Sequence, residues 1–127
     1  MKLLGVGTDL VAVARFVRLT ERGGHRFLDR WFSRDEVAYA LSCHEPARHI
    51  AARFAAKEAV LKSLRSADLP PPHWAEIEVT RDSSGLPGIR LHGATQAFAR
   101  SLGVSSVQVT LAHDGQYATA TAVAVVD

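Results

Sequence analysis

The stretch RFAAKEAVLKSL, residues 53–64, predicts the central helix of this protein. Its helical segment opens at Pro46, a residue favoured in the first turn of a helix. Large apolar residues recur at near-helical spacing between alanines, at Ile50, Phe54, Leu61 and Leu64. Three prolines at 70–72 prevent the helix from continuing. We therefore expect a helix from Pro46 to Leu64, whose small alanine side chains allow it to pack closely on a neighbouring element.

The charged residues of this stretch allow two interpretations. Glu58 and Lys62 are i,i+4 neighbours, which is typical of a surface ion pair worth about 0.3–0.5 kcal/mol. Alternatively, Glu58 is an oxygen ligand for Mg²⁺, and Lys57 and Lys62 bind phosphate. Magnesium is commonly held by one or two carboxylates together with substrate phosphates, so Glu58 would need only one acidic partner. The helix alone favours the surface pair.

Asp9 is the acid that fits such a partnership. It follows the apolar, glycine-punctuated run KLLGVGT, which is typical of a buried strand. A carboxylate buried there needs a metal, a cation or a helix N-terminus. The alternative is that Thr8 or Asp9 caps the next helix.

The rest of the chain changes from helical to strand patterning near its middle. A helix is expected from Val13 to the glycines at 23–24, and a second begins at Ser33, where Glu36 completes a capping box. Alternating runs at 75–93 and 106–126 predict two hairpins, with a short helix at 94–102 between them. We therefore expect a single α+β domain over residues 1–127. Its helices lie mainly in the first half, packed on an antiparallel sheet built from the N-terminal strand and the C-terminal half.

Composition limits the classes of function. The chain of 127 residues is 47% hydrophobic and 22% charged, which is ordinary for a globular protein, and its net charge is only +2. Nucleic-acid binding ranks last, because the charge is modest and no aromatic residues interleave the arginines. The lone Cys43 excludes an intramolecular disulfide framework and fits a cytoplasmic location. The apolar runs at the two ends are too short for a signal peptide or a membrane span.

Two further groups of residues have a plain and a functional interpretation. Arg15, Arg18 and Arg22 form a basic stripe on the first helix, with Arg26 and Phe27 just beyond. Such a stripe is either a solvated face or a docking surface for an acidic protein. His113 ends the strand run VQVTLAH, where it either makes a hydrogen bond or contacts a ligand.

Four blocks of sequence then occur in a specific order. They are GVGTDLVAVARF, ARFAAKEAVLKSL, RDSSGLPGIRLHG and VTLAHDGQYATATAV, which together span nearly the whole chain. In this order they resemble the holo-acyl-carrier-protein synthase family, the small bacterial type of 4′-phosphopantetheinyl transferase. The pairing of the F-A-A-K-E-A block with an upstream G-x-x-x-D-hydrophobic block is highly specific to that family.

The resemblance implies a reaction, a cofactor and a site. A serine hydroxyl of an acyl carrier protein attacks the β-phosphate of coenzyme A, which releases adenosine 3′,5′-bisphosphate. Asp9 and Glu58 match the family's Mg²⁺ ligands, Lys62 joins them as a catalytic residue, and the serine proton passes to Glu58 or to a water on the metal. The implied coenzyme A contacts are Arg53, Phe54, Lys57, Lys62, Pro87 and His113. The implied contacts to the carrier protein are Arg15, Arg22, Arg26 and Phe27.

The resemblance also implies a homotrimer with active sites between subunits. The carrier protein is expected to serve a fatty-acid, polyketide or peptide synthase. Two positions depart from the family pattern, namely Arg65 in place of a glycine and Asp114 in place of a hydroxyl residue. The alternatives are an inactive relative that still binds carrier protein, and a metal-dependent phosphoesterase acting on coenzyme A or nucleotides.

Overall fold

The structure, a computed structural model, describes residues 1–21 and 26–127. In chain order the elements are β1 (Lys2–Ala12), α1 (Val13–Trp31), α2 (Arg34–Ser42), α3 (Pro46–Ser63), a 3₁₀ turn (Trp74–Glu76), β2 (Ile77–Arg81), β3 (Pro87–Leu91), α4 (Gly93–Ser101), β4 (Val104–Asp114) and β5 (Tyr117–Val126). Among the described residues, no helix has both the length and the apolar character needed to cross a bilayer.

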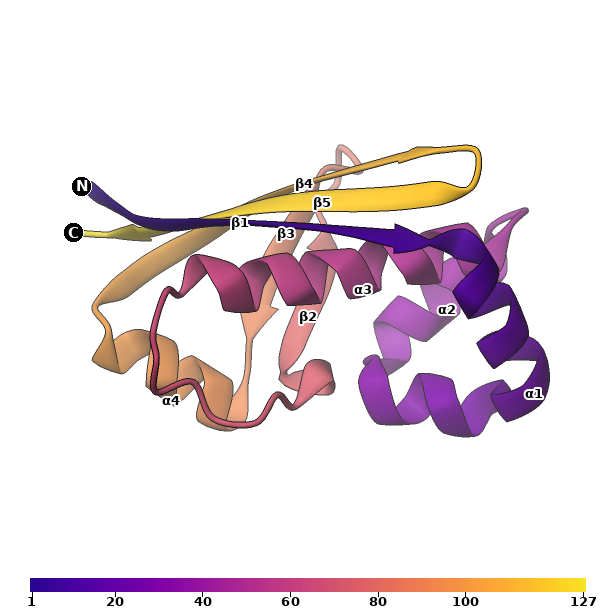
Figure 1. Cartoon of the computed structure of the whole chain (residues 1–127), viewed down its shortest axis with the longest axis horizontal. Coiled ribbons are helices and arrows are strands. Elements are labelled where there is room, and N and C mark those ends of the chain that lie inside the picture. Colours follow the sequence, from indigo (N-terminus) through magenta and orange to yellow (C-terminus); the bar gives the residue numbers. More distant parts are fainter.

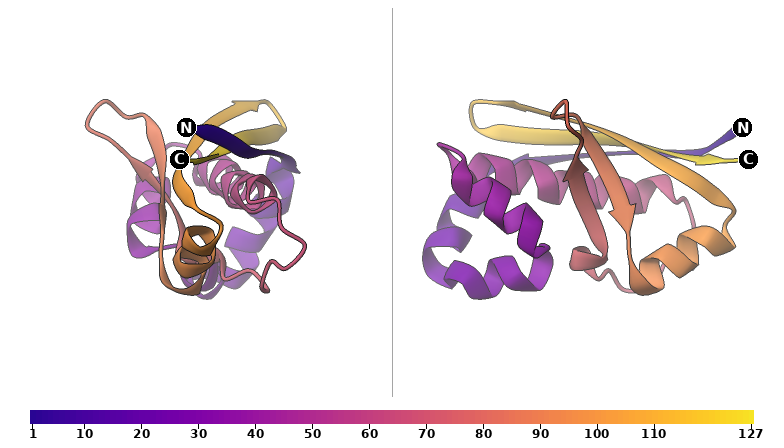
Figure 2. Two further views of the ribbon diagram at one scale, coloured as in Figure 1. Left: turned by 90° about the vertical axis from the view of Figure 1, so that its left-hand side faces the viewer. Right: turned by 180° about the vertical axis from the view of Figure 1, so that it is seen from behind.

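The strands form two antiparallel sheets around α3. One sheet has the order β1-β5-β4, so the N-terminal strand pairs with the C-terminal one, and β2 pairs with β3 in the other. Figure 1 shows α3 running beneath the larger sheet along β1, with α1 and α2 near the tip of the β4–β5 hairpin. The smaller sheet stands beside α3 (Figure 2). The predicted α+β class with an antiparallel sheet is confirmed.

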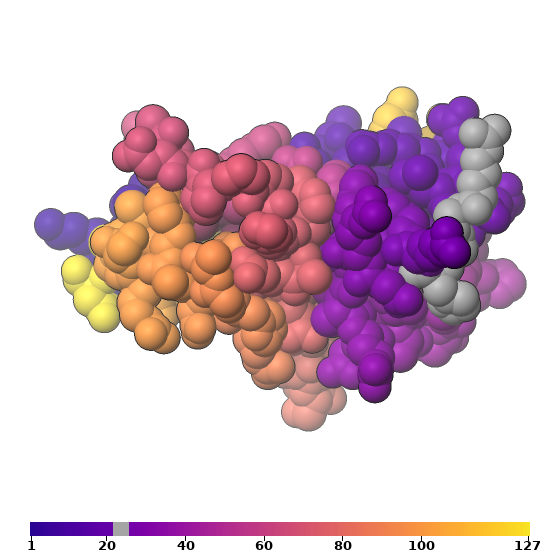
Figure 3. All heavy atoms as spheres, turned by 90° about the horizontal axis from the view of Figure 1, so that it is seen from below, coloured from indigo at the N-terminus to yellow at the C-terminus, as the bar shows by residue number. Residues whose placement is uncertain are grey.

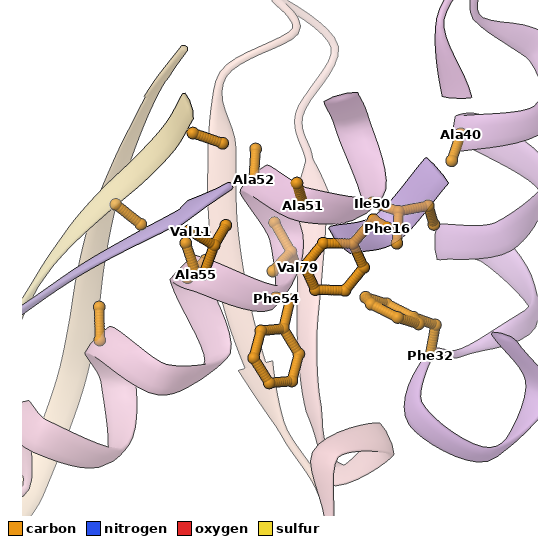
Figure 4. Close-up of a cluster of buried hydrophobic side chains, with 14 of the residues drawn as sticks. Val11, Phe16, Phe32, Ala40, Ile50, Ala51, Ala52, Phe54, Ala55 and Val79 are labelled. Carbon is orange, nitrogen blue, oxygen red and sulfur yellow. The ribbon is translucent and has the colours of Figure 1, made fainter. Parts of the chain in front are cut away.

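Small side chains allow α3 to lie close to the larger sheet. Alternate residues of β5 are buried alanines, and so are most residues on the facing side of α3 (Figure 4). They are Ala118, Ala120, Ala122 and Ala124 on β5, and Ala51, Ala52, Ala55, Ala56 and Ala59 on α3. The prediction that alanines permit close packing of this helix is therefore confirmed.

An aromatic cluster fills the space between α1, α3 and the turn after α3. The Phe54 ring lies 5.4 Å from Phe16, 5.3 Å from Trp31 and 5.1 Å from Trp74, measured between ring centroids. Offset and tilted pairs at these separations add to the free energy gained from burial. Seen from below, α1 and α2 form one end of the molecule, and α4 with the loop after α3 forms the other (Figure 3).

The first helix ends later than its sequence pattern predicts. It was expected to stop at Gly23–Gly24, but α1 ends at Trp31, and Leu28 is buried in the core. Burial of Leu28 and of the aromatic residues around it outweighs the weak helix propensity of glycine. The capping box at Ser33 and Glu36 is confirmed, with both reciprocal hydrogen bonds present.

Candidate active site at the junction of β1 and α3

Two glycines bring β1 against the backbone of α3. Gly5, Gly7 and Asp9 occupy alternate positions of β1 and so share the face that meets the helix. A Cβ atom added to Gly7 would overlap the carbonyl oxygen of Ala59, and one added to Gly5 would overlap that of Ser63. Only glycine permits this approach, and the approach carries Asp9 to the last two turns of α3.

Asp9 and Lys62 meet across this junction. The Lys62 ammonium donates a hydrogen bond to the Thr8 carbonyl oxygen at 2.9 Å and lies 3.3 Å from Asp9 Oδ1. The Thr119 hydroxyl donates to the Asp9 carbonyl oxygen at 2.7 Å, which fixes the backbone of Asp9. The Asp9 side chain is 18% exposed and that of Lys62 is 52% exposed. The pair is therefore held by the fold on one side and open to solvent on the other.

Glu58 belongs to the same group of charges. Burial raises the pKa of its carboxyl group, the Asp9 charge raises it further, and the cations Lys62 and Arg15 oppose that rise. Two carboxylates that interact in this way favour a shared cation. The two plain interpretations do not hold. The residue at the N-cap of α1 is Ala12, with no side-chain cap, and the ion pair of Lys62 is with Asp9.

These two carboxylates suit Mg²⁺ by their chemistry. Within the described residues, no group of three metal-ligating side chains occurs, so Asp9 and Glu58 would supply only part of a coordination shell. That is the donor set expected of a magnesium ion that also binds substrate phosphate and water.

Lys57 does not lie where the sequence interpretation placed it. Its ammonium is fully buried and makes three hydrogen bonds, to Glu36 Oε1 at 2.8 Å and to the carbonyl oxygens of Trp74 at 2.9 Å and Ile77 at 2.6 Å. All three donors of the ammonium are thereby used. The expectation that Lys57 binds phosphate is corrected here, because the side chain ties α3 to α2 and β2 and does not reach solvent.

The buried position of Phe54 also corrects an expectation. Its side chain is enclosed by the aromatic cluster described above and is 3% exposed. A ring in that position is part of the core between α1 and α3 and presents no face to a coenzyme. An apolar residue of a helix has the same sequence spacing whether it belongs to the core or lines a site.

The other predicted coenzyme contacts gather at a second place. A cavity of about 190 Å³ lies between α2, α3, β2, β3 and β4. It is lined by Arg53, Pro87 and His113, which were predicted, and by Tyr39, His49 and Arg81, which were not. The side chains that meet here come from elements spread along the chain from α2 to β4. Only the i,i+4 spacing of His49 and Arg53 on one helix was available as a signal.

The predicted docking residues on α1 have different environments. Arg15 and Arg26 are exposed. The Arg15 guanidinium lies 5.4 Å from the Phe54 ring centroid, and its positive charge opposes the rise in the pKa of Glu58. Phe27 is half-buried, with its ring 4.6 Å from that of Trp31, so it is mainly a member of the aromatic cluster. Arg22 lies outside the described residues. Arg15 is therefore both part of the basic stripe on α1 and close enough to Glu58 for its charge to act on that carboxylate.

Known proteins share this sequence and architecture. A family model described as the 4′-phosphopantetheinyl transferase superfamily matches residues 5–122. The chain is 42% identical to the holo-[acyl-carrier-protein] synthase of Moorella thermoacetica, over 94% of this chain and 92% of the relative.

Solved structures agree. The holo-[acyl-carrier-protein] synthase of Neisseria meningitidis superposes with a TM-score of 0.85 at 27% identity, covering 97% of this chain and 98% of the other. The ACPS-CoA complex of Chronobacterium ammoniagenes gives 0.81 at 31% identity, covering 100% and 99%. The chain belongs to the 4′-phosphopantetheinyl transferase superfamily.

Proposed function

We propose that this protein transfers 4′-phosphopantetheine from coenzyme A to a serine of an apo acyl carrier protein. The observation that carries the proposal is the meeting of Asp9, Glu58 and Lys62 at the glycine-lined junction of β1 and α3. It is supported by relatives named holo-[acyl-carrier-protein] synthase and by a related structure that binds coenzyme A.

The reaction has a simple balance. The serine oxygen forms a bond to the β-phosphorus of coenzyme A, and the bond from that phosphorus to the bridging oxygen breaks. Adenosine 3′,5′-bisphosphate leaves with that electron pair, and the serine loses its proton. Catalysis of this kind depends mostly on positioning and on neutralising the charge of the phosphates.

The residues of the junction meet these needs. Asp9 and Glu58 would hold Mg²⁺, and a bound Mg²⁺ would neutralise negative charge on the pyrophosphate. Lys62 is exposed on the same site and carries a cation to the phosphates. Arg15, near Glu58 and at the start of the basic stripe, would meet the carrier protein where its serine enters.

We further propose that residues 1–127 form one domain and that three copies assemble through the open face of the larger sheet. On β1 and β5, the residues that point away from α3 alternate with the buried ones. At the β4–β5 turn this face ends with Ala12, Tyr117 and the charged Asp114. Over the rest of the face the residues, with their partners on β4, are Leu3, Val6, Thr8, Leu10, Thr119, Thr121, Val123, Val125, Ser106, Gln108, Thr110 and Ala112. None of these is charged, and Leu3, Val6 and Leu10 are large exposed apolar residues. A face of this kind indicates self-association.

The experiment that tests the proposed function measures adenosine 3′,5′-bisphosphate released from coenzyme A, with and without apo carrier protein. Transfer requires that release depends on the carrier and stops when its acceptor serine is replaced by alanine. Release at the same rate without carrier would instead establish the phosphoesterase. No release under either condition, with several carrier proteins, would favour the inactive relative.

A further inference from the structure

The cavity between α2, α3, β2, β3 and β4 is lined by a buried cation, Arg53, whose hydrogen bonds are incomplete among the described residues. Arg53 is 6% exposed, and its Nε has no hydrogen-bond partner among the described residues. Burial lowers the pKa of Arg53, which reflects the cost of removing its charge from water, and the charge of Glu36 opposes this shift. A buried guanidinium of this kind is stabilised when an anion completes its hydrogen bonds.

A second guanidinium shares the same aromatic ring. The Cζ atom of Arg53 lies 4.3 Å from the Tyr39 ring centroid, and that of Arg81 lies 4.1 Å from it. Tyr39 thus makes cation–π contacts with two like charges that line one cavity. A multiply charged anion bound beside them would relieve the repulsion between the two guanidinium groups.

His49 lies beside these cations. Its ring is edge-on to Tyr39, at 5.6 Å between centroids, and 6.2 Å from His113 across the cavity. Burial lowers the pKa of His49, and the charges of Arg53, His113, Arg48 and Arg81 lower it further. In the free protein these influences favour the neutral imidazole.

We propose that His49 is a proton-linked specificity residue of the coenzyme site, which takes up a proton when a phosphate of the substrate enters the cavity beside Arg53 and Arg81. This inference rests on the proposed function, because that function supplies the phosphate ligand. The groups that face His49 are Tyr39 from α2, Arg48 and Arg53 from α3, Arg81 from β2 and His113 from β4.

The direction of the pH effect follows from this arrangement. A bound phosphate adds negative charge to a cluster of positive groups, so it raises the pKa of His49 relative to the free protein. Binding therefore takes up a proton at pH values between the free and the bound pKa. Affinity gained through His49 is present at the acid end of that range and is lost as pH rises through the bound pKa.

The test compares wild type with His49→Phe, which keeps an aromatic ring against Tyr39 and His113, and with His49→Gln, which keeps polarity without charge. Binding of coenzyme A is measured by calorimetry from pH 5.5 to 8.5, without carrier protein. The ligand titrates in the same way with every variant, so the difference between proteins at each pH isolates His49. His73→Phe, an exposed histidine in the loop before β2, is the matched control.

We expect both His49 variants to weaken binding about 3- to 10-fold at pH 6 and less than about 2-fold at pH 8, the scale of one charge-assisted hydrogen bond in a partly exposed site. NMR titration should show the His49 pKa rising on addition of coenzyme A. Equal weakening at every pH would overturn the proposal and leave His49 a packing residue, and so would an unchanged affinity or a bound pKa that does not rise.

Dephospho-coenzyme A, which lacks the ribose phosphate, identifies the phosphate involved. Loss of the His49-dependent pH effect with this ligand assigns the cavity to the ribose phosphate, and its retention assigns it to the pyrophosphate. Both outcomes support an anion site at His49. Failure here is distinguishable from failure of the proposed function. Wild type that binds coenzyme A with the expected pH effect but modifies no carrier protein would refute the transferase alone.

Discussion

The ammonium of Lys62 lies 3.3 Å from the Asp9 carboxylate, although 53 positions separate the two residues in the chain. The contact depends on β1 lying against the backbone of α3, which Gly5 and Gly7 permit. The chemistry of the site therefore depends on residues that have no side chain.

Replacing either carboxylate should abolish most transfer without unfolding the protein. Asp9→Asn and Glu58→Gln remove the oxygen charges that would hold Mg²⁺ but keep the side-chain shape. We expect transfer to fall about 100- to 1,000-fold, as for loss of one preorganised electrostatic group. The measurement is the initial rate of carrier modification, with thermal unfolding as the fold control. Near-normal turnover in either variant would contradict the metal assignment.

Lys57 and Lys62 provide a matched pair on one helix. Lys57→Met leaves the buried Glu36 without its cation and should lower the free energy of unfolding by about 3–5 kcal/mol. Lys62→Met removes an exposed cation and should change it by less than about 1 kcal/mol. The transfer rate should follow the opposite order, with the larger loss in Lys62→Met. Lys57→Met is assayed for this purpose at a temperature where it is folded. Denaturant unfolding and transfer rates measure the two effects, and similar profiles for both variants would refute the division of roles.

The glycine junction is tested by adding one methyl group. Gly7→Ala places a Cβ on the Ala59 carbonyl oxygen, so β1 must move away from α3. We expect a loss of about 1–3 kcal/mol in stability, together with reduced transfer because Asp9 moves with the strand. Gly88→Ala is the control, since its nearest neighbour is the Thr80 side-chain oxygen at 3.0 Å. A Gly7→Ala protein as stable as Gly88→Ala would show that the close approach is not required.

Arg26 tests the docking surface with least disturbance to the junction. Arg26→Gln should raise the KM for carrier protein about two- to five-fold and leave the KM for coenzyme A unchanged, as expected of one exposed charge contact. The effect should shrink at high salt because exposed charges are screened. Arg100→Gln, on α4, is the control. Parallel changes in both KM values would count against a docking role for the stripe.

The open face of the larger sheet should control assembly. Val6→Lys places a charge among uncharged neighbours on that face, so it should convert the proposed trimer to monomer. Leu41→Lys, another exposed apolar position, should leave assembly unchanged. Sedimentation velocity measures the outcome. A wild-type protein that sediments as a monomer at high concentration would remove the assembly proposal.

Local patterns in the sequence were sufficient for most of the fold. The capping box at Ser33, proline at the start of α3 and the alternation of β4 and β5 each report on their own backbone, and each prediction was confirmed. The end of α1 was predicted wrongly because burial of Leu28 is a tertiary effect. Glycine at 23–24 signals only a local preference.

The residues of the site were harder to predict from the sequence, because side chains on one helix have different roles. Lys57 and Lys62 look equivalent in the sequence, yet one pairs with buried Glu36 and the other with Asp9. Glu36 was expected only to cap α2, and its second use as the partner of Lys57 had no sequence signal. Tyr39 and Arg81 were missed for the same reason, since the cavity exists only where α2, α3, β2, β3 and β4 meet.

The most direct test is the intact mass of an apo carrier protein after incubation with this protein, coenzyme A and Mg²⁺. We expect a gain of one phosphopantetheinyl group on the acceptor serine. In the time that the wild type needs for full modification, we expect little or no gain with Asp9→Asn or Glu58→Gln. An unmodified carrier with wild type, across fatty-acid, polyketide and peptide synthase carriers, would contradict the proposed transferase activity, and so would full modification by both variants in that time.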